Sequence, residues 1–282
     1  MKSIVSTVKS SIYDPAFYHS LLEKPFRFSL RYFFSLVVVL ALVSAITVSI
    51  SAVPAANSFF STLGPKAISY YPEGLELTFK DGVASSNVEE PFVVALPEDI
   101  ASSHGSAREH QDIKQLLVID TKDTFDLAAF KGFSTLVLLN RDTLTYQDNH
   151  GEVRIQPLKN VPNTKITKSL VASLVSKVEP VLRTLTIALP FIIFFGMFLF
   201  YTATLVTLLF EALLVWGLAK IKKLSIGYGK AYQISLHAVT LSLFVGTVLM
   251  LLLPGFNIPF LFTILLVFVT WFNLFKKTEA IS

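Results

Sequence analysis

The longest apolar run in the chain extends over residues 184–210 and contains no charged residue. Three further uncharged apolar runs cover residues 32–53, 231–253 and 260–275. A helix needs about 20 apolar residues to cross a bilayer core of ~30 Å. The pattern therefore predicts four transmembrane helices, the second of which we expect to extend over residues 184–218.

The polar region between the first two runs, residues 54–183, has a different pattern. Prolines, glycines and charges return, and short strand-like segments alternate with turns. Residues 115–120 and 135–139 are continuous apolar segments, which are typical of central strands buried on both faces. Residues 124–130 between them predict a short helix. About 130 residues suffice for a separate core, so this region predicts a small, strand-rich α+β domain.

Turn signals predict the hairpins of this domain. Leu75–Lys80 alternates apolar and polar residues and is followed by Asp81-Gly82, a preferred two-residue hairpin turn. The other elements expected here are a strand at residues 92–96, a polar loop at 102–112, and a hairpin of 143–147 with 152–156 around the turn 148–151.

An amphipathic helix is predicted at the end of the domain, beginning at Thr164. Its apolar stripe recurs about every four residues and consists of Ile166, Leu170, Leu174 and Val178. Pro180 is expected to interrupt this helix just before the membrane run. The helix would then be a stalk that joins the domain to the bilayer, with its stripe packed against the domain or a neighbour.

Residues 1–31 mix aromatic and basic side chains and are divided by Pro15 and Pro25. A short helix between these prolines would have an apolar face formed by Phe17, Tyr18, Leu21 and Leu22. Two interpretations are equally consistent with this pattern. The segment is either an interfacial helix on the inner leaflet or a loosely ordered lead-in to the first span.

The charge distribution predicts how the chain crosses the membrane. Charged residues make up only 16% of the chain, below the roughly 25% of soluble domains. Residues 1–31, 219–230 and 276–282 together hold 11 of the 24 Lys and Arg residues but only 3 of the 20 Asp and Glu residues. By the positive-inside rule these segments are cytoplasmic. Both termini are then inside, and residues 54–183 and the turn 254–259 are extracytoplasmic.

The chain contains no cysteine, so disulfides and thiolate metal sites are excluded. An outer domain without disulfides fits a bacterial envelope better than an animal secretory pathway. We therefore expect a multi-pass protein of the bacterial cell membrane. The net charge of +4 is explained by the basic segments expected on the cytoplasmic side and by their contact with anionic lipids, rather than by nucleic-acid binding. The expected partners are the bilayer and other membrane or envelope proteins, and no nucleic acid.

Two polar positions in the predicted spans are candidates for function. Glu211 directly follows the longest apolar run, and acids within membranes are often functional. The run length also places it near the inner interface, where pairing with Lys220 or a neighbouring helix would explain it. His237 lies close to Tyr232 and Gln233 in the third span. This group could line a small cavity with Glu211, or His237 could be a buried histidine hydrogen-bonded between helices.

The polar domain contains two groups of candidate ligands. Asp120, Asp123 and Asp126 follow a buried strand, where α/β proteins bind ligands, although this spacing also suits the start of a helix. The loop at 102–112 contains the metal-type residues His104, Glu109, His110 and Asp112. Their spacing matches no zinc signature, so neither a metal nor a cofactor is predicted. No nucleophile or acid/base motif is recognised, and we expect a protein that is not an enzyme.

Four segments carry a resemblance to a known family: SIYDPAFYHSLLEKPFRFSLRYF, YPEGLELTFKDGVASSNVEEPF, LLVIDTKDTFDLAAF and TLVLLNRDTLTYQDNHGEVRIQPL. Together they resemble bacterial membrane proteins with the domain of unknown function 1189, some of which are labelled maltodextrin-utilisation-protein-like. The resemblance implies at most an accessory role in sugar uptake and transfers no catalytic residue. The C-terminal segment around KIKKLSIGYGKAYQISL is also similar to Yip1-type membrane domains.

The sequence thus predicts an α-helical polytopic membrane protein with four transmembrane helices. An extracytoplasmic, strand-rich α+β domain is inserted between helices 1 and 2. The leading functional hypothesis is a non-enzymatic envelope or accessory protein whose outer domain binds a ligand or a protein partner. The alternative is a component of a transport system with a polar path through the membrane.

Overall fold

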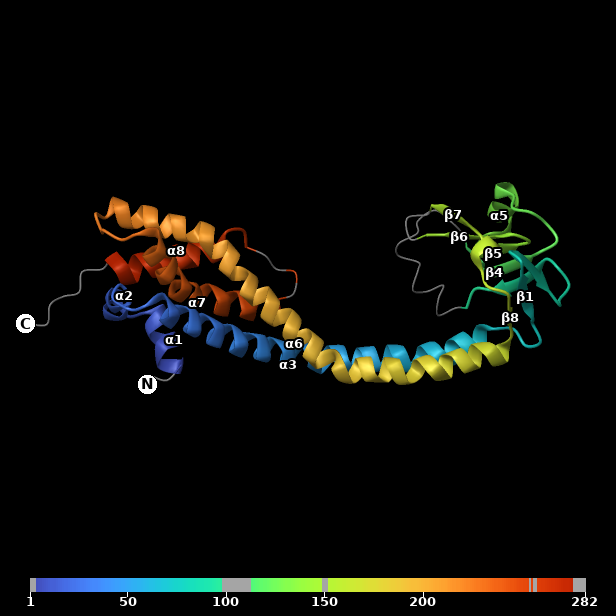
Figure 1. The fold of residues 1–282 in the computed structure, drawn as a ribbon, viewed down its shortest axis with the longest axis horizontal. Helices are drawn as coiled ribbons and strands as arrows, with labels where there is room; N and C mark the ends of the chain where they lie inside the picture. Colours follow the sequence, from blue (N-terminus) through green and yellow to red (C-terminus); the bar gives the residue numbers. More distant parts are fainter. Residues whose placement is uncertain (1–3, 98–112, 149–151, 254, 256–257, 276–282) are drawn as a thin grey trace, which may run out of the picture. The chain divides into compact units, whose positions relative to one another are not determined.

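The computed structural model (Figure 1) describes all residues except 1–3, 98–112, 149–151, 254, 256–257 and 276–282. The chain divides into two compact units. One, the helical unit, combines Met1–Ala56 with Leu185–Ser282, and the other, the strand unit, is Asn57–Thr184. The predicted loop at 102–112 and most of the predicted turn at 148–151 lie outside the described residues.

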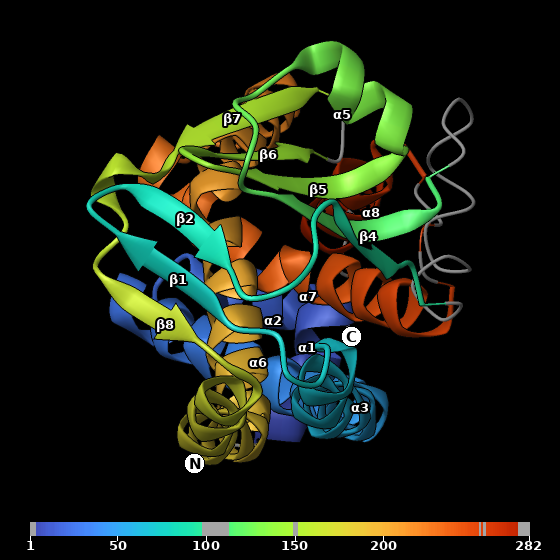
Figure 2. The same cartoon turned by 90° about the vertical axis from the view of Figure 1, so that its right-hand side faces the viewer.

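Two sheets form the strand unit (Figure 2). The larger sheet has the order β3-β4-β5-β6-β7 and the smaller one the order β2-β1-β8. The only parallel pair among the described strands is β4 with β5, and α5 (Leu127–Phe133) connects them. The strands are β1 (Leu77–Lys80), β2 (Val83–Ser86), β3 (Phe92–Ala95), β4 (Gln115–Asp120), β5 (Thr135–Asn140), β6 (Thr143–Gln147), β7 (Val153–Pro157) and β8 (Thr164–Ile166), with a 3₁₀ turn at Leu158–Asn160.

The central strands β4 and β5 of the larger sheet are covered on both faces, and their alternating side chains point to one face or the other. Val118 on β4 and Leu138 on β5 pack with Phe130 of α5 on one face. Ile119 and Leu139, the next residue on each strand, pack on the other face with residues of the smaller sheet such as Leu77, Phe79 and Ala84. The prediction of two central strands with a helix between them is confirmed, although the helix begins at Leu127 rather than at residue 124, because Asp126 caps it.

Both predicted hairpins are present. Asp81 and Gly82 connect β1 to β2, and both have positive φ angles, 52° and 80°. This geometry requires residues that tolerate the left-handed region, which is why Asp-Gly favours the turn. The second hairpin pairs β6 with β7 in antiparallel register, Gln147 opposite Val153.

The helices α3 (Phe26–Tyr70) and α6 (Lys168–Ile221) are longer than predicted, at 45 and 54 residues. Thr164–Ile166 is a strand beside β1 rather than the start of the helix, and α6 continues through Pro180. The predicted interruption at Pro180 is wrong, because a proline removes one helical hydrogen bond while the flanking turns keep theirs. Residues after 53, predicted to leave the helix, remain in α3.

Within the strand unit, the end of α3 packs closely against the start of α6. A Cβ atom added to Gly64 would lie 2.5 Å from Cγ1 of Val175, well inside van der Waals contact. The predicted stripe on α6 is not fully covered, since Leu174 and Val178 each expose about half of their surface, 52% and 49%.

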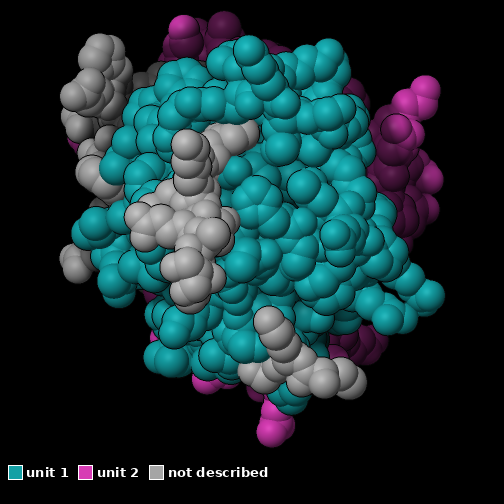
Figure 3. All heavy atoms as spheres, turned by 90° about the vertical axis from the view of Figure 1, so that its left-hand side faces the viewer, with its two compact units in different colours: residues 1–56, 185–282 teal, residues 57–184 magenta. Residues whose placement is uncertain are grey.

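The helical unit contains the apolar runs found in the sequence and packs as one body (Figure 3). Three of its helices, α3, α6 and α7 (Tyr228–Leu252), are long and apolar enough to cross a membrane. The apolar helix α8 (Leu261–Phe275) is shorter, at 15 residues. These helices indicate a membrane protein. α3 and α6 are longer than the hydrocarbon core of a bilayer is thick, so part of each must extend beyond the core.

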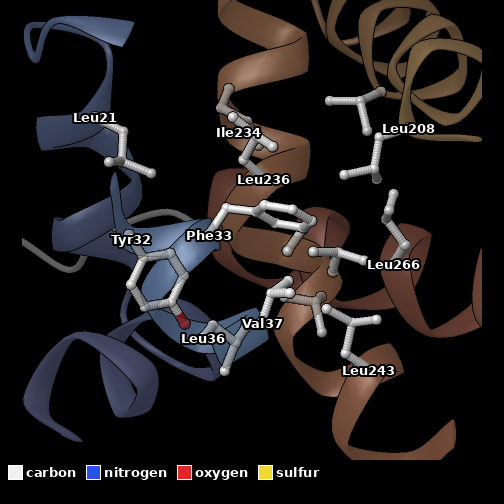
Figure 4. Packing of buried hydrophobic residues seen from close by; sticks show 14 of the residues in the cluster. Leu21, Tyr32, Phe33, Leu36, Val37, Leu208, Ile234, Leu236, Leu243 and Leu266 are labelled. Carbon is white, nitrogen blue, oxygen red and sulfur yellow. The ribbon is translucent and has the colours of Figure 1, made fainter. Parts of the chain in front are cut away.

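α7 is the central helix of this unit. In each long apolar helix we compare the most apolar stretch of 18 residues. Of this stretch 56% is buried in α7, compared with 33% in α3 and 11% in α6. Figure 4 shows Ile234, Leu236 and Leu243 of α7 among side chains of neighbouring helices, including Phe33 of α3 and Leu266 of α8. α6 instead leaves large apolar side chains exposed, as expected for a helix that faces lipid.

The N-terminal segment folds into two short helices, α1 (Ile4–Ile12) and α2 (Pro15–Leu21). Asp14 caps α2, because its carboxylate accepts a hydrogen bond from the Phe17 N–H at 3.0 Å. The apolar face of α2 is buried in the core of the unit. The described part of this segment is therefore helical rather than loosely ordered, and the apolar face of α2 packs against protein; a position of the segment at the inner leaflet stays a prediction.

Candidate functional site

His237, in the first half of α7, connects three helices of the helical unit through polar contacts, which makes it the hub of these contacts. Its side chain is fully buried. Nδ1 lies 2.8 Å from Ser11 Oγ of α1, and Nε2 lies 3.0 Å from Ser29 Oγ of α3. A neutral imidazole has one donor and one acceptor nitrogen, and a hydroxyl can serve as either. Both ring nitrogens are therefore satisfied in either tautomer.

Three aromatic rings enclose the imidazole. Tyr32 is stacked on it, with ring centroids 4.4 Å apart and an interplanar angle of 10°. Phe28 stacks at 5.9 Å, and Phe17 approaches edge-on at 5.1 Å. The tyrosine hydroxyl lies 2.8 Å from Oγ1 of Thr240, one turn along α7. The rings exclude solvent from His237 and join α2, α3 and α7.

The other two candidates from the third span have structural partners. The Gln233 amide donates to the Lys24 carbonyl at 3.1 Å, and the Lys230 ammonium donates to the same carbonyl at 2.8 Å. Tyr232 donates its hydroxyl proton to the Leu205 carbonyl of α6 at 2.9 Å. Gln233 thus links α7 to the segment between α2 and α3, whereas Tyr232 links α7 to α6.

Glu211 belongs to a different contact. Its Oε1 accepts a hydrogen bond from the Thr263 hydroxyl of α8 at 2.6 Å. Its Oε2 is buried and has no hydrogen-bond partner among the described residues. Of the two partners expected for Glu211, a neighbouring helix is found, through Thr263 of α8, whereas Lys220 is not, because its ammonium lies over the Trp216 ring at 4.1 Å. The hydrogen bonds described for Glu211 and His237 have no residue in common.

The sequence reasoning missed Asn273 near the end of α8. Its carbonyl oxygen accepts from the Asp14 N–H at 2.7 Å, and its amide donates to the carbonyls of Ile12 and Val269 at 3.0 and 2.8 Å. It binds the turn between α1 and α2 to α8. An amide in an otherwise apolar segment was the available signal, since such groups form contacts between helices.

In the strand unit, the residue that sequence reasoning missed is Glu90, just before β3. Its carboxylate accepts hydrogen bonds from the Thr121 N–H, the Thr121 hydroxyl and the Lys122 N–H at 2.8, 2.7 and 3.1 Å, and also from the Ser86 hydroxyl. Partial burial favours the neutral acid, but these donors lower the pKa of Glu90 below its ordinary value. Glu90 thereby joins the start of β3 to the end of β4.

Of the three predicted aspartates, Asp120 and Asp123 are close enough to influence each other, whereas Asp126 caps a helix. Burial, together with the nearby charges of Asp123 and Glu90, raises the pKa of Asp120. Asp123 accepts from the Arg141 N–H through its backbone carbonyl. Asp126 is the N-cap of α5 and accepts from the Ala128 N–H at 2.9 Å, as the capping interpretation predicted. No group of three metal-type side chains that could hold an ion occurs among the residues that the structure describes.

A comparison with known protein families matches the chain to a family that is described as a protein of unknown function. No curated protein and no solved structure matches the chain. The match extends over residues 6–275 and so includes the His237 contacts, Glu211, Asn273 and the whole strand unit. The chain therefore belongs to the DUF1189 family.

Proposed function

We propose that the protein is a non-enzymatic protein of the bacterial cell membrane. In this proposal the helical unit is an anchor, and the strand unit binds a ligand or a protein partner outside the cytoplasm. Four spans, α3, α6, α7 and α8, would leave both termini in the cytoplasm. The distribution of Lys and Arg supports this orientation, and the apolar character of α8 supports the fourth span.

The observation that carries the proposal is the closed network around His237. Its two ring nitrogens both have hydroxyl partners at hydrogen-bond distance, and aromatic rings surround it. A histidine on a transport path needs access to water or substrate, whereas this one is fully buried. Such satisfied polar groups hold helices together in membranes, which is the role of an anchor.

The strand unit has the properties expected of an interaction domain. It has its own core between the two sheets and α5, and charged side chains on its surface. A partner should therefore be found by crosslinking the full-length protein in its native membrane, followed by affinity purification. The proposal predicts crosslinks from strand-unit residues to another envelope component, and recovery of crosslinks from the helical unit alone would contradict it.

Topology has a separate test. A reporter inserted after Asn149 should be accessible from outside the cell, and one fused after Ser282 should be protected. Protection of the first reporter would reverse the proposed orientation without affecting the family assignment.

Glu211 favours a second candidate function, a component of a transport system. Its Oε2 is buried without a partner among the described residues, and unsatisfied acids in membranes commonly bind ions or protons. Glu211→Gln keeps the size and one acceptor of the side chain. If the protein serves transport, this variant should abolish substrate-linked growth or flux at normal expression. Unchanged flux would leave only the anchor function.

A further inference from the structure

A groove at the start of α3 combines basic and apolar side chains. It encloses about 450 Å³ and lies between α1 and the first turns of α3. Its cationic lining is formed by Lys24, Arg27 and Arg31, and its apolar lining includes Ile4, Phe28 and Tyr32. None of the described residues that line it is a carboxylate.

The ion pairs found among the described residues include none of the three cations. Within the described part of the chain, neither Arg27 nor Arg31 forms an ion pair with a carboxylate. They stand four residues apart on α3, so they lie on the same helix face and repel each other. The ammonium of Lys24 lies over the rings of Phe17 and Phe28, at 4.9 and 4.4 Å. An anion between them would relieve this repulsion.

The groove also meets the apolar surface of the span. Tyr32 is the first residue of the uncharged run that crosses the membrane, and Arg31 is the last cation before it. A ligand with its charge at Arg27 and Arg31 could thus place an apolar chain along α3 toward Ser35, which also lines the groove. Phosphate oxygens match arginine, whose planar guanidinium can donate two parallel hydrogen bonds.

We propose that this groove binds a single anionic phospholipid. Its phosphate group lies between Lys24, Arg27 and Arg31, and one acyl chain follows the apolar side of the groove. A soluble phosphate compound would use the cations but leave the apolar lining exposed, which is why a lipid fits better. The lipid site rests on the proposed membrane location of the helical unit and shares Phe28 and Tyr32 with the His237 cluster, but it involves neither the strand unit nor Glu211.

The test is native mass spectrometry of the full-length protein in detergent, titrated with phosphatidylglycerol or phosphatidylcholine. We expect one phosphatidylglycerol to be retained under conditions that remove phosphatidylcholine. The double variant Arg27→Gln/Arg31→Gln should bind phosphatidylglycerol roughly 30-fold more weakly, from about 1 kcal/mol for each cation near a lipid surface. Glycerol 3-phosphate should neither bind nor compete at the concentrations that saturate the lipid site.

Two further variants separate a built site from general surface charge. Lys222→Gln/Lys223→Gln removes the same charge from the loop before α7 and should retain the lipid. Ser35→Phe keeps every cation but fills the groove, and it should weaken binding without changing the melting temperature. Equal losses in the two charge variants, full binding by Ser35→Phe, equal retention of phosphatidylcholine, or binding of glycerol 3-phosphate would each overturn the proposal.

Discussion

The helical unit and the strand unit satisfy their polar groups in different ways. The fully buried side-chain hydrogen bonds described in the helical unit join neutral groups, such as His237 with Ser11 and Ser29, and Glu211 is an exception with one buried carboxylate oxygen. The strand unit pairs full charges at its surface, for example Lys165 with Glu76 at 2.7 Å, where both side chains stay exposed. Lipid cannot solvate an isolated charge, so burying a neutral, hydrogen-bonded group there costs much less free energy than burying a charge. Water solvates charges well, which makes exposed pairs common but weak.

This difference shows where each unit should be sensitive to mutation. In the helical unit a single buried polar side chain connects helices that are far apart in sequence. In the strand unit the sensitive positions should be the few that are both charged and partly buried, such as Glu90. Four substitutions test the contrast, and they follow in order of expected effect.

The largest effect is expected for His237→Ala. It removes a fully buried ring, three aromatic contacts and the partners of two buried hydroxyls, so we expect a loss of about 3–5 kcal/mol. Thermal unfolding in detergent micelles measures it. Phe195→Ala is the matched control, because that ring is 61% exposed on α6. Equal stability of the two variants would show that the His237 network is not a hub.

Gly64→Ala should destabilise the helix pair in the strand unit by about 2 kcal/mol, because the new methyl group would meet Val175. The double variant Gly64→Ala/Val175→Ala should regain most of this loss, since the clash is removed and alanine favours a helix by up to about 1 kcal/mol over glycine. Hydrogen exchange of residues 57–70 and 168–184 reports the change. A double variant no better than Gly64→Ala would contradict close packing here.

Glu90→Gln should cost about 1.5 kcal/mol, since it weakens charge-assisted hydrogen bonds to Thr121 and Lys122. The lowered pKa of Glu90 makes the folded state bind its proton less readily than the unfolded state. Its stabilising contribution is therefore complete above pH ~4.5 and declines as the pH falls through the folded-state pKa.

The measurement is hydrogen exchange of β3 and β4 between about pH 2.5 and pH 6, a range that includes the decline expected below pH ~4.5, corrected for intrinsic exchange rates. The exposed neighbour Glu89 provides the control substitution Glu89→Gln. The Glu90 variant should lose part of the acid sensitivity seen in the unsubstituted protein, and an unchanged pH profile would show that this carboxylate does not join the strands.

Tyr201→Phe should have the smallest effect, about 0.6 kcal/mol, the mean for hydrogen bonds between membrane helices. Its hydroxyl lies 2.9 Å from Ser44 and 2.8 Å from Thr247 and so links α6 to α3 and α7. Tyr13→Phe, at a ring that is 58% exposed, is the control in the same unfolding assay. A loss above about 2 kcal/mol would make Tyr201 a second hub.

The candidate sites were only partly readable from sequence. Glu211 and His237 stand out as polar residues in apolar runs, but their partners do not. Ser11 lies 226 residues from His237, and Thr263 lies 52 residues from Glu211. Serines and threonines are too frequent for any one of them to be recognised as a partner. Glu90 was missed for the same reason, since the donors that link it to β4, Thr121 and Lys122, are 31 and 32 residues away.

The sequence alone determined the features that depend on local pattern. The apolar runs predict the long helices because transfer from water to an apolar phase depends on composition. The runs at 115–120 and 135–139 and the Asp81-Gly82 turn predict strands and a hairpin because side-chain alternation and positive φ angles are local properties.

Only the tertiary structure decided which apolar faces meet and which backbone segments continue. The face of α2 is buried because α7 and α8 cover it, and nothing in residues 1–31 distinguishes such a cover from lipid. Thr164–Ile166 becomes a strand because β1 offers it a free edge. α3 and α6 continue through prolines because their packing outweighs a local loss of one hydrogen bond. These outcomes depend on contacts between residues that are distant in sequence. The free energy of such contacts cannot be deduced from a local sequence pattern.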